Sequence, residues 1–514
     1  MHRKLLPRSL AALTVAAVTL AVAACGGSGS SDKDPASAVP DRAPVYLEAE
    51  LRPEGEKGDD ARAVLGKLLR TSDVDREIAA ILDEELKDSK EGLSFREDID
   101  PWVGDRAAVA VLDQRRGRED PDVLVVINSR DDEKARAAIA KVRDVKKVNH
   151  RGADYYVNKS EDNAIALVDG RVLIGQETSV KAGIEVLKGD RDPLSEAKGL
   201  KDIRDQLDDD RVGLAYANVA RLGELSEGAV GLDWVETAQS LRSAFAKGED
   251  GSFGVGLELD PDALRFEAVA LGAQAQQVEG EASDLLAALP EDAWLALGVG
   301  DLGKTLNQAL DQVAKEGRSL GLDPRRLLEQ VKTMFGIDVE RDLLSWMGDG
   351  AVFVRGDAKR PGGALVIQST DPARSGQAVA RITRLLRALE LRPRTTRVAG
   401  VSALRIDIED LPEPILVAGK GDRFAIAYGS AALRGALDSG GRLGESRGFR
   451  EATAKLEDVK PSLFVDTPAL VKVFGSELDD DPRARKALST LGPIAGGGEV
   501  DDDKATYDLV VGIR

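Results

Sequence analysis

The chain has 514 residues, a formal net charge of −19, one cysteine and two histidines. This length is more than one hydrophobic core usually supports, so we expect two domains or more. The acidic excess disfavours binding to nucleic acid and to anionic lipid headgroups. One cysteine and two histidines leave no disulfide and no cysteine- or histidine-rich metal site, so we expect no metal and no cofactor.

The N-terminus has the pattern of a bacterial lipoprotein signal. Arg3, Lys4 and Arg8 form a basic start, and an apolar run too short to span a bilayer follows. The run ends in VAAC, with small residues before Cys25. We therefore predict acylation of Cys25 and anchoring to the outer face of the cytoplasmic membrane. An ordinary secretory signal with an unrelated cysteine is the alternative.

Cleavage at this point changes the charge of the chain and sets its division into segments. Residues 1–24 carry three bases and no acid, so their removal takes the net charge from −19 to −22. The sequence GGSGSSDKDPASA then has linker composition and would span roughly 20 Å. We divide the chain into a signal peptide (1–24), a linker that begins at the acylated cysteine (25–38), a first repeat (39–272) and a second repeat (285–514).

The first repeat contains short strands and helices, which we predict from apolar periods of two and of 3.6 residues. Asp131 or Asp132 is a plausible N-cap, and the Asp169–Gly170 pair is a strong hairpin signal. In chain order we predict a strand at 43–51, helices at 61–69 and 74–86, strands at 107–112 and 123–128, a helix at 132–142, strands at 153–158, 164–168 and 171–176, helices at 179–187 and 199–207, a strand at 212–217, and two strands within 253–271.

The second part of the chain repeats this order. Five segments match collinearly: residues 39–49 with 289–299, the two W-x-G-D blocks, 125–142 with 365–382, 171–187 with 423–439, and 194–207 with 443–456. Residues 506–514 match only the first of the two closing strands. We therefore predict an α+β fold, a tandem duplication of two similar halves, each a mostly antiparallel sheet with helices packed on it.

The W-x-G-D frame occurs once in each repeat, as PWVGDR and SWMGDG. One interpretation is a tryptophan that stacks on a ligand beside a polar aspartate. The interpretation that we prefer is structural: a core tryptophan, a glycine with positive φ, and an aspartate that accepts backbone N–H bonds in an Asx turn. Gly350 stands where the first repeat has Arg106. The structural-motif residues are Trp102, Gly104, Asp105, Trp346, Gly348 and Asp349.

Together with SRDDEKARAAIAKV and AIALVDGRVLIG, the first frame, FREDIDPWVGDRAAVAV, resembles the domain-of-unknown-function family 3352. Members of that family are bacterial, are often anchored lipoproteins, and carry a W-x-G-D-x-A block. The resemblance covers most of residues 39–222 and extends more weakly over 289–474. It implies an architecture and a location, and it implies no catalytic residue.

No catalytic constellation stands out. His150 is the only histidine beyond the signal; we interpret it as a loop residue before a strand, and no G-x-S-x-G elbow supplies a serine for it. GVGDLG at 298–303 matches a dinucleotide fingerprint, but the first repeat has EAELRP there, and the surrounding pattern is antiparallel. We interpret it as a strand-to-helix turn. GGG at 496–498 is interpreted as a loop.

The leading hypothesis is a membrane-anchored envelope lipoprotein that is not an enzyme and binds a ligand or a protein. Its candidate partners are the membrane through Cys25, an envelope protein, and an apolar ligand enclosed by the sheets. The alternative is an envelope hydrolase that uses paired carboxylates on cell-wall glycan, with two carboxyl groups about 5–9 Å apart in a cleft. A purely structural partner of another envelope protein is the third hypothesis.

Overall fold

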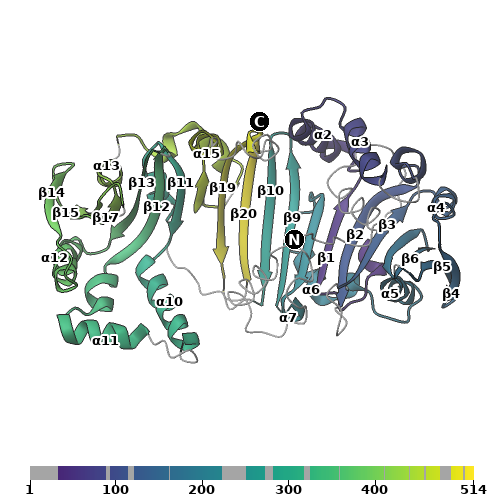
Figure 1. Ribbon diagram of the computed structural model, residues 1–514, viewed down its shortest axis with the longest axis horizontal. Helices are drawn as coiled ribbons and strands as arrows, with labels where there is room; N and C mark the ends of the chain where they lie inside the picture. The colour runs from purple at the N-terminus through teal and green to yellow at the C-terminus, as the bar shows by residue number, and fades with distance from the viewer. Residues whose placement is uncertain are drawn as a thin grey trace. The chain divides into compact units, whose positions relative to one another are not determined.

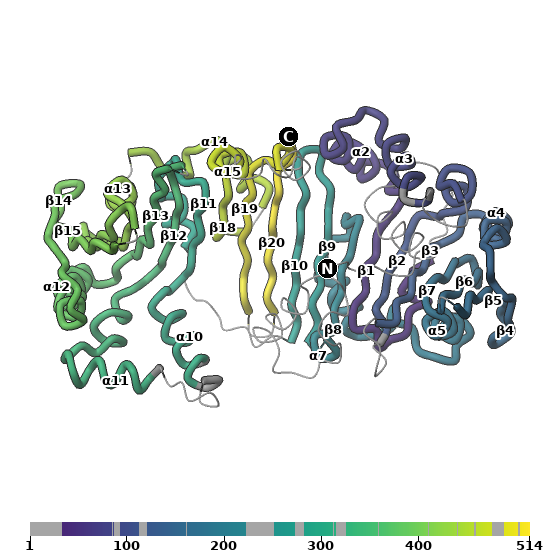
Figure 2. Tube along the Cα trace, in the orientation of Figure 1, coloured from purple at the N-terminus to yellow at the C-terminus, as the bar shows by residue number. Residues whose placement is uncertain are grey.

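The structure is a computed structural model, drawn as a ribbon in Figure 1 and as a tube in Figure 2. The predicted signal peptide and Cys25 lie outside the residues that it describes. Two compact units are present; the first holds the described residues up to 272 together with Val500–Tyr507, and the second holds most of the remainder. The structure describes residues 33–87, 93–113, 121–160, 162–222, 251–272, 282–317, 324–357, 359–409, 411–438, 440–456, 459–474, 488–501 and 504–514.

The strands of the first unit form an antiparallel array in the order β10-β9-β8-β1-β2-β3-β7-β6-β5-β4. The predicted hairpin between β6 and β7 is confirmed, since Asp169 and Gly170 both have positive φ. The strands are β1 (Val45–Glu50), β2 (Val103–Asp113), β3 (Asp122–Ser129), β4 (Lys146–His150), β5 (Ala153–Asn158), β6 (Asn163–Val168), β7 (Arg171–Gln176), β8 (Gly213–Asn218), β9 (Ser252–Asp260) and β10 (Ala263–Leu271).

The helices of the first unit bury apolar stripes against this array. In α3, Ile78, Leu82 and Leu86 follow one another at four-residue spacing and are all buried. Asp131 caps α4 by accepting the N–H groups of Glu133 and Lys134. The helices are η1 (Pro35–Ala38), α2 (Gly55–Leu69), α3 (Val74–Lys87), η2 (Phe95–Ile99), α4 (Asp132–Ile139), α5 (Glu177–Leu187), η3 (Leu194–Glu196), α6 (Lys198–Arg204) and α7 (Val219–Leu222).

The second unit has the corresponding strand order, β19-β18-β11-β12-β13-β17-β16-β15-β14, with β20 beside β19. Its strands are β11 (Ala293–Val299), β12 (Met347–Asp357), β13 (Arg360–Ser369), β14 (Arg394–Val398), β15 (Val401–Ile406), β16 (Ile415–Lys420), β17 (Arg423–Tyr428), β18 (Leu463–Val465), β19 (Leu491–Val500) and part of β20 (Lys504–Ile513), whose residues are divided between the two units.

The helices of the second unit occur between its strands in nearly the same order as in the first unit. Figure 1 shows α10 and α11 lying beyond the ends of β11 and β12. In the part of the chain that the structure describes, no helix is both long and apolar enough to cross a bilayer. The helices are α9 (Ser283–Ala287), α10 (Leu302–Gly317), α11 (Pro324–Phe335), η5 (Glu340–Leu344), α12 (Pro372–Ala388), α13 (Ser430–Leu437), η6 (Leu443–Glu445), α14 (Arg447–Thr453) and α15 (Thr467–Phe474).

The α+β class is correct, but the prediction of two halves that each hold a separate sheet is wrong. All the described strands belong to one twenty-stranded sheet, because β10 pairs with β20. Without this pairing, β10 and β20 would each have backbone N–H and C=O groups without partners along one side. The pairing satisfies these groups in both strands. The closing strands were also mispredicted. The segment from Leu491 to Val500, including the GGG stretch expected to be a loop, is strand β19.

The strand registers align the two units residue by residue. The irregular stretch after the W-x-G-D frame is one residue longer in β2 than in β12. Beyond it, Ala107 pairs with Ile127, and Gly350 pairs with Ile367. Gly350 therefore matches Ala107, and Arg106 is the additional residue of the bulge. The predicted match of Gly350 with Arg106 is corrected accordingly.

Candidate functional site

The W-x-G-D frames place both tryptophans in the core. Trp102 and Trp346 are 2% and 1% exposed. Each indole Nε1 donates to a carbonyl oxygen four residues earlier, at 2.8 Å for Asp98 and 3.3 Å for Asp342. The buried rings present no open face to a ligand in this structure, so their burial favours the packing interpretation of the frame.

The glycines of the frames have a different role from the one predicted. Neither Gly104 nor Gly348 has positive φ. A Cβ on Gly104 would lie 2.9 Å from the Asn128 carbonyl oxygen, and one on Gly348 would lie 3.0 Å from that of Gln368. Glycine is therefore needed here because the backbone of the next strand approaches closely. The positive-φ turn is a wrong prediction.

The aspartate of the second frame also acts differently. The Asp349 Oδ1 accepts the N–H of Asp301 at 3.0 Å and so ties the W-x-G-D corner to the start of α10. The Asx turn predicted for Asp349 is therefore wrong. In the first frame, the main-chain oxygen of Asp105 accepts the N–H of Leu51 at 2.6 Å, which ties β2 to the segment after β1.

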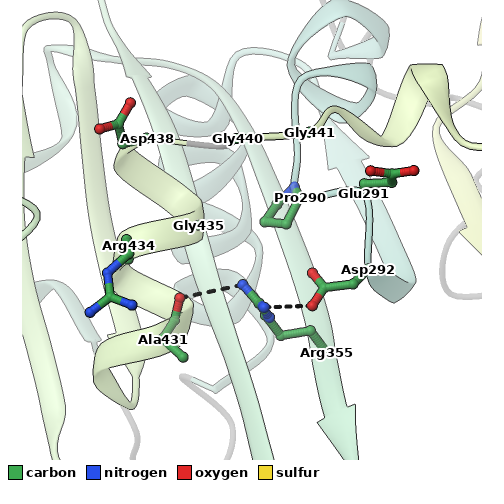
Figure 3. A pocket seen from close by; sticks show the side chains of 10 residues that line it. All are labelled: Pro290, Glu291, Asp292, Arg355, Ala431, Arg434, Gly435, Asp438, Gly440 and Gly441. Atoms are coloured by element: carbon green, nitrogen blue, oxygen red, sulfur yellow. Dashed lines mark hydrogen bonds and ion pairs between the residues drawn. The ribbon is translucent and has the colours of Figure 1, made fainter.

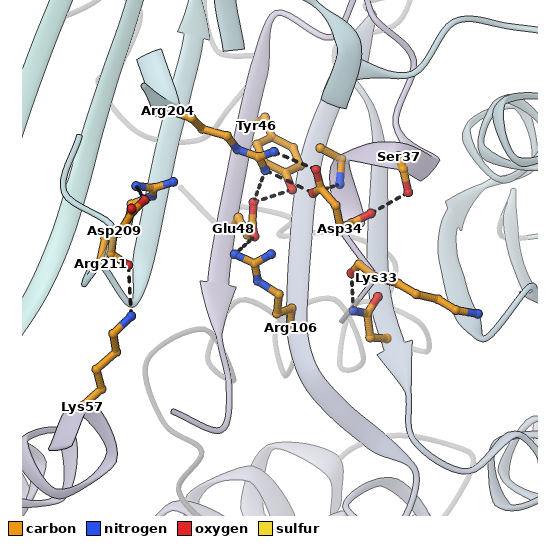
Figure 4. A network of polar contacts seen from close by, with 12 residues as sticks. Lys33, Asp34, Ser37, Tyr46, Glu48, Lys57, Arg106, Arg204, Asp209 and Arg211 are labelled. Atoms are coloured by element: carbon orange, nitrogen blue, oxygen red, sulfur yellow. Dashed lines mark hydrogen bonds and ion pairs between the residues drawn. The ribbon is translucent and has the colours of Figure 1, made fainter. Parts of the chain in front are cut away.

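A group of charged side chains lies between β1, β2 and α6 of the first unit, and Figure 4 shows them converging. We call Asp34, Tyr46, Glu48, Arg106 and Arg204 the charge cluster. The two Nη atoms of Arg204 lie 2.7 and 3.1 Å from the Asp34 oxygens, and Nη2 is also 2.7 Å from Glu48 Oε2. Arg106 Nη2 is 3.0 Å from Glu48 Oε1, and the Tyr46 hydroxyl donates to Oε2 at 2.9 Å.

Burial and pairing compete in the charge cluster. Burial on its own would raise the pKa of Asp34, but the hydrogen bonds and positive charge of Arg204 outweigh it, and the pKa lies below its ordinary value. Burial alone would lower the pKa of Arg204, but the hydrogen bond to Asp34 and the negative charges of Asp34 and Glu48 outweigh burial. The net effect raises the pKa above its ordinary value, so this guanidinium stays charged. Burial and the neighbouring Glu48 carboxylate raise the pKa of Tyr46 well above its usual range. The cluster is a mutually neutralising network.

The sequence contained a signal for this cluster that the periodicity analysis passed over. In VYLEAE, Tyr46 and Glu48 lie two residues apart and therefore point to the same face of β1. Since Tyr46 belongs to the core, Glu48 must be buried and must find a cation. The cation comes from Arg204, more than 150 residues further along the chain, so the sequence predicts the need for a partner but not its identity.

The second unit has a polar pocket of about 560 Å³ between the start of β11 and α13. In Figure 3, Arg355 reaches across it; Nη2 lies 2.5 Å from Asp292 Oδ2, and Nη1 is 3.4 Å from the Ala431 oxygen. Gly435 is buried beneath the pocket, where a Cβ would lie 2.8 Å from Pro290 Cγ. The residues that line the pocket are Pro290, Glu291, Asp292, Arg355, Ala431, Arg434, Gly435, Asp438, Gly440 and Gly441.

The matching positions of the first unit are apolar. By the repeat alignment, Ala182 and Val186 on α5 stand where α13 has Arg434 and Asp438. Both are buried, and η1 packs against α5 at this place. The first unit therefore closes this corner with apolar side chains, whereas the second leaves a pocket lined by both signs of charge.

His150 does not lie in a loop. It is the last residue of β4, and its Nε2 is 2.9 Å from Glu185 Oε1, while Arg191 Nε lies 2.6 Å from the other oxygen of that carboxylate. The sequence analysis missed β4 because KKVNH has almost no apolar side chains. Through its contact with Glu185, His150 links β4 to α5.

The G-x-G-x-x-G match has a packing explanation. A Cβ on Gly298 would lie 2.9 Å from that of Ala282, and one on Gly303 would lie 2.4 Å from the Leu344 carbonyl oxygen. β11 pairs antiparallel with both neighbours, unlike the parallel strands of a dinucleotide-binding fold. Among the described residues, no group of three or more His, Cys, Asp or Glu side chains is arranged to hold a metal ion.

These features define an α+β protein with an antiparallel sheet, a buried charge cluster in one unit and a polar pocket in the other. The family of proteins of unknown function DUF3352 matches residues 9–489, and the chain belongs to it. No curated protein matches the sequence. Crystal form I of TP0453 is similar with a TM-score of 0.28 at 9% identity, over 48% of this chain and 82% of that one. For crystal form IV the values are 0.26, 9%, 46% and 81%. Similarity of this size assigns neither fold nor function.

Proposed function

We propose that this protein is a lipid-anchored envelope protein whose second unit binds a small polar ligand. The observation that carries the binding part is the pocket of about 560 Å³ beside Arg355. A volume of this order is typical of small-molecule sites, which use a few charged groups to fix orientation. The earlier expectation of an apolar ligand stays a prediction, while the charged lining favours a polar one.

The anchor is supported by the VAAC sequence before Cys25. Cys25→Ser removes the thiol that would be acylated, so the protein should move from the membrane fraction to the soluble fraction. Cell fractionation followed by immunoblotting measures this change. Retention of Cys25→Ser on membranes would contradict the anchor but leave the pocket proposal intact, because the pocket lies in another part of the chain.

The ligand should carry both signs of charge. Arg355 and Arg434 supply cations, and Glu291, Asp292 and Asp438 supply carboxylates. Arg355 already pairs with Asp292, and Asp438 lies 3.3 Å from Lys420 Nζ. The remaining pair of opposite charges, Arg434 and Glu291, suits an amino acid or a short peptide, whose own two charges complement them.

Blocking the pocket tests this proposal without removing any charge. Gly440 lines the pocket and a Cβ there meets nothing within 4 Å, so the backbone has room for a side chain, and we expect the ring of Gly440→Trp to obstruct the pocket. Calorimetric titration with amino acids and dipeptides should show binding to the unaltered protein and at least a tenfold loss for Gly440→Trp. The matched control is Gly376→Trp, which is equally open but lies on α12. Absence of binding to the unaltered protein would refute the proposed ligand class.

The same carboxylates keep the hydrolase hypothesis as a second candidate. Glu291 and Asp438 line one pocket, and a glycosidase needs two carboxyl groups on either side of the scissile bond. Release of reducing ends from purified cell-wall glycan, abolished by Glu291→Gln and by Asp438→Asn, would favour this alternative. No release, together with binding of a small ligand, would favour the binding module.

A further inference from the structure

The helices beyond the strand ends of the second unit expose apolar side chains. Val313 of α10 is 51% exposed, and Leu327 and Met334 of α11 are 62% and 66% exposed. Leu327 and Met334 are seven residues apart and thus share one face of the helix. None of the described side chains of α11 is buried, whereas the corresponding helix of the first unit, α3, buries Ile78, Leu82 and Leu86.

A basic segment accompanies this apolar surface. Between Pro372 and Val398 the chain has seven arginines and only one acidic residue, Glu390. Arg374 and Arg381 pair with aspartates. The other five are exposed and make no ion pair with any residue that the structure describes: Arg384, Arg387, Arg392, Arg394 and Arg397.

Apolar side chains are interspersed with these arginines. Leu389 and Leu391, 57% and 43% exposed, follow α12 directly and lie in sequence between Arg387 and Arg392. α12, which carries Arg384 and Arg387, also contacts α11. We call α11 together with residues 384–397 the basic apolar face.

We propose that the basic apolar face docks on an anionic lipid bilayer. The leucines and the methionine would enter the boundary between headgroups and acyl chains, while the arginines would bind lipid phosphates and extend their aliphatic stems along the apolar layer. The net charge of −22 expected for the mature chain predicts overall repulsion from anionic lipid, but charges more than about 8–10 Å from the contact are largely screened at physiological salt, so the local arginines dominate.

Charge complementarity favours a bilayer over a soluble acidic protein. Between Arg384 and Arg392 the arginines alternate in sequence with leucines, as in segments that lie in a membrane interface. The lipid on Cys25 would hold the chain near a membrane and so raise the effective concentration of the surface. This rise in effective concentration rests on the proposed anchor, whereas the contact with the bilayer depends only on α11 and residues 384–397.

Vesicle binding by the mature chain with Cys25→Ser tests the inference without the anchor. We expect this protein to sediment with phosphatidylglycerol-containing vesicles and not with pure phosphatidylcholine vesicles. Changing Arg384, Arg387 and Arg392 together to Gln should weaken binding by about fivefold per arginine, since each basic residue near an anionic surface contributes on the order of 1 kcal/mol. Leu327→Asn with Met334→Asn should weaken it by about tenfold, because two apolar anchors are lost.

A charge-matched control separates a local contact from general attraction. Arg42, Arg76 and Arg143 are exposed arginines of the first unit, and their triple change to Gln alters the net charge equally. This control should bind like the parent, and circular dichroism should show that all the variants remain folded. Equal loss in both triple variants, or no vesicle binding at all, would overturn the proposal. Binding to polyglutamate but not to vesicles would assign the face to an acidic protein instead.

Discussion

The same strand pair is filled in opposite ways in the two units. In the first, Tyr46 of β1 lies opposite Ala110 of β2; in the second, Ala296 of β11 lies opposite Phe353 of β12. All four residues are fully buried. The large ring is thus on one strand in the first unit and on the other strand in the second. The core therefore constrains the summed volume of the pair and leaves open which strand supplies the large side chain.

Around this strand pair, the polar side chains differ between the two units more than the summed side-chain volume does. Glu48 of the first unit corresponds to Gly298, and Arg204 corresponds to Thr453. Phe353 cannot donate the hydrogen bond that Tyr46 gives to Glu48. Among the residues of the second unit that the structure describes, the charge cluster therefore has no counterpart, and the shared arrangement of strands forms without it. We infer that the cluster adds stability or specificity to one unit and is not required by the fold.

The largest expected effect tests what the two units share. Trp102→Ala and Trp346→Ala should each lower the free energy of unfolding by about 3–5 kcal/mol, because each removes a buried ring and leaves a cavity. Urea unfolding followed by circular dichroism measures the change. Leu297→Ala is the control, since this leucine is 45% exposed. A stable Trp102→Ala variant that had lost ligand binding would reverse the packing interpretation of the frame.

The next prediction tests what separates the units. Arg204→Ala leaves Asp34 and Glu48 without their main cation, and should lower the free energy of unfolding by about 2–4 kcal/mol; we place it below the largest values for buried pairs because Arg204 is partly exposed. Thr453→Ala at the matching position of α14 should change it by less than about 1 kcal/mol. Equal effects of the two substitutions, measured by urea unfolding, would remove the distinction between the units.

Much of the fold follows from local patterns in the sequence. Alternation located the central strands. Asp131 or Asp132 was predicted to cap a helix, and Asp131 does so; the Asp169–Gly170 pair predicted a hairpin that the structure contains. Strand β4 was missed because KKVNH has a single apolar side chain, and β19 because a proline and three glycines interrupt the alternation of LGPIAGGGEV. That β10 and β20 join all the strands into one sheet depends on backbone pairing, which leaves no mark in side-chain periodicity.

The candidate sites were less predictable than the fold. Glu48 on an inward-facing position required a cation, but Asp34 and Arg204 are 170 residues apart in sequence and only the fold brings them together. The pocket depends on how closely α13 packs against the start of β11, which periodicity does not report. The glycines of the W-x-G-D frames were predicted from turn preferences, whereas their role depends on a neighbouring strand.

A smaller change in the free energy of unfolding is expected at Gly298, the closely packed position of the second unit that corresponds to Glu48 of the first. Gly298→Ala should lower the free energy of unfolding by about 1–3 kcal/mol, because the added Cβ would lie 2.9 Å from that of Ala282. Thermal unfolding measures the change. Gly376→Ala is the control: it lies within α12 with open space around it, and should stabilise by about 0.5–1 kcal/mol through helix propensity. A neutral Gly298→Ala variant would show that this corner has room for a side chain.

The smallest effect concerns a carboxyl group whose burial differs between the units. Glu258 of β9 is half-buried, and its burial, opposed by the nearby Arg265, raises its pKa to about 7 from an ordinary value of 4.5. The strand registers place Glu499 of β19 at the matching position, and that side chain is exposed. Only the first unit should therefore show a pH-dependent cost at this position.

The sign follows from proton binding. Below about pH 4.5 Glu258 is protonated in both the folded and the unfolded chain; between about pH 4.5 and 7 the folded chain retains the proton that the unfolded chain has lost, so stability falls as the pH rises. Glu258→Gln removes this loss and should raise the free energy of unfolding by about 1–2 kcal/mol at pH 8, with little change at pH 4. Urea unfolding at the two pH values measures it, with Glu499→Gln as the control. Equal gains for both variants at pH 8 would show that general charge repulsion, and not the burial of Glu258, causes the effect.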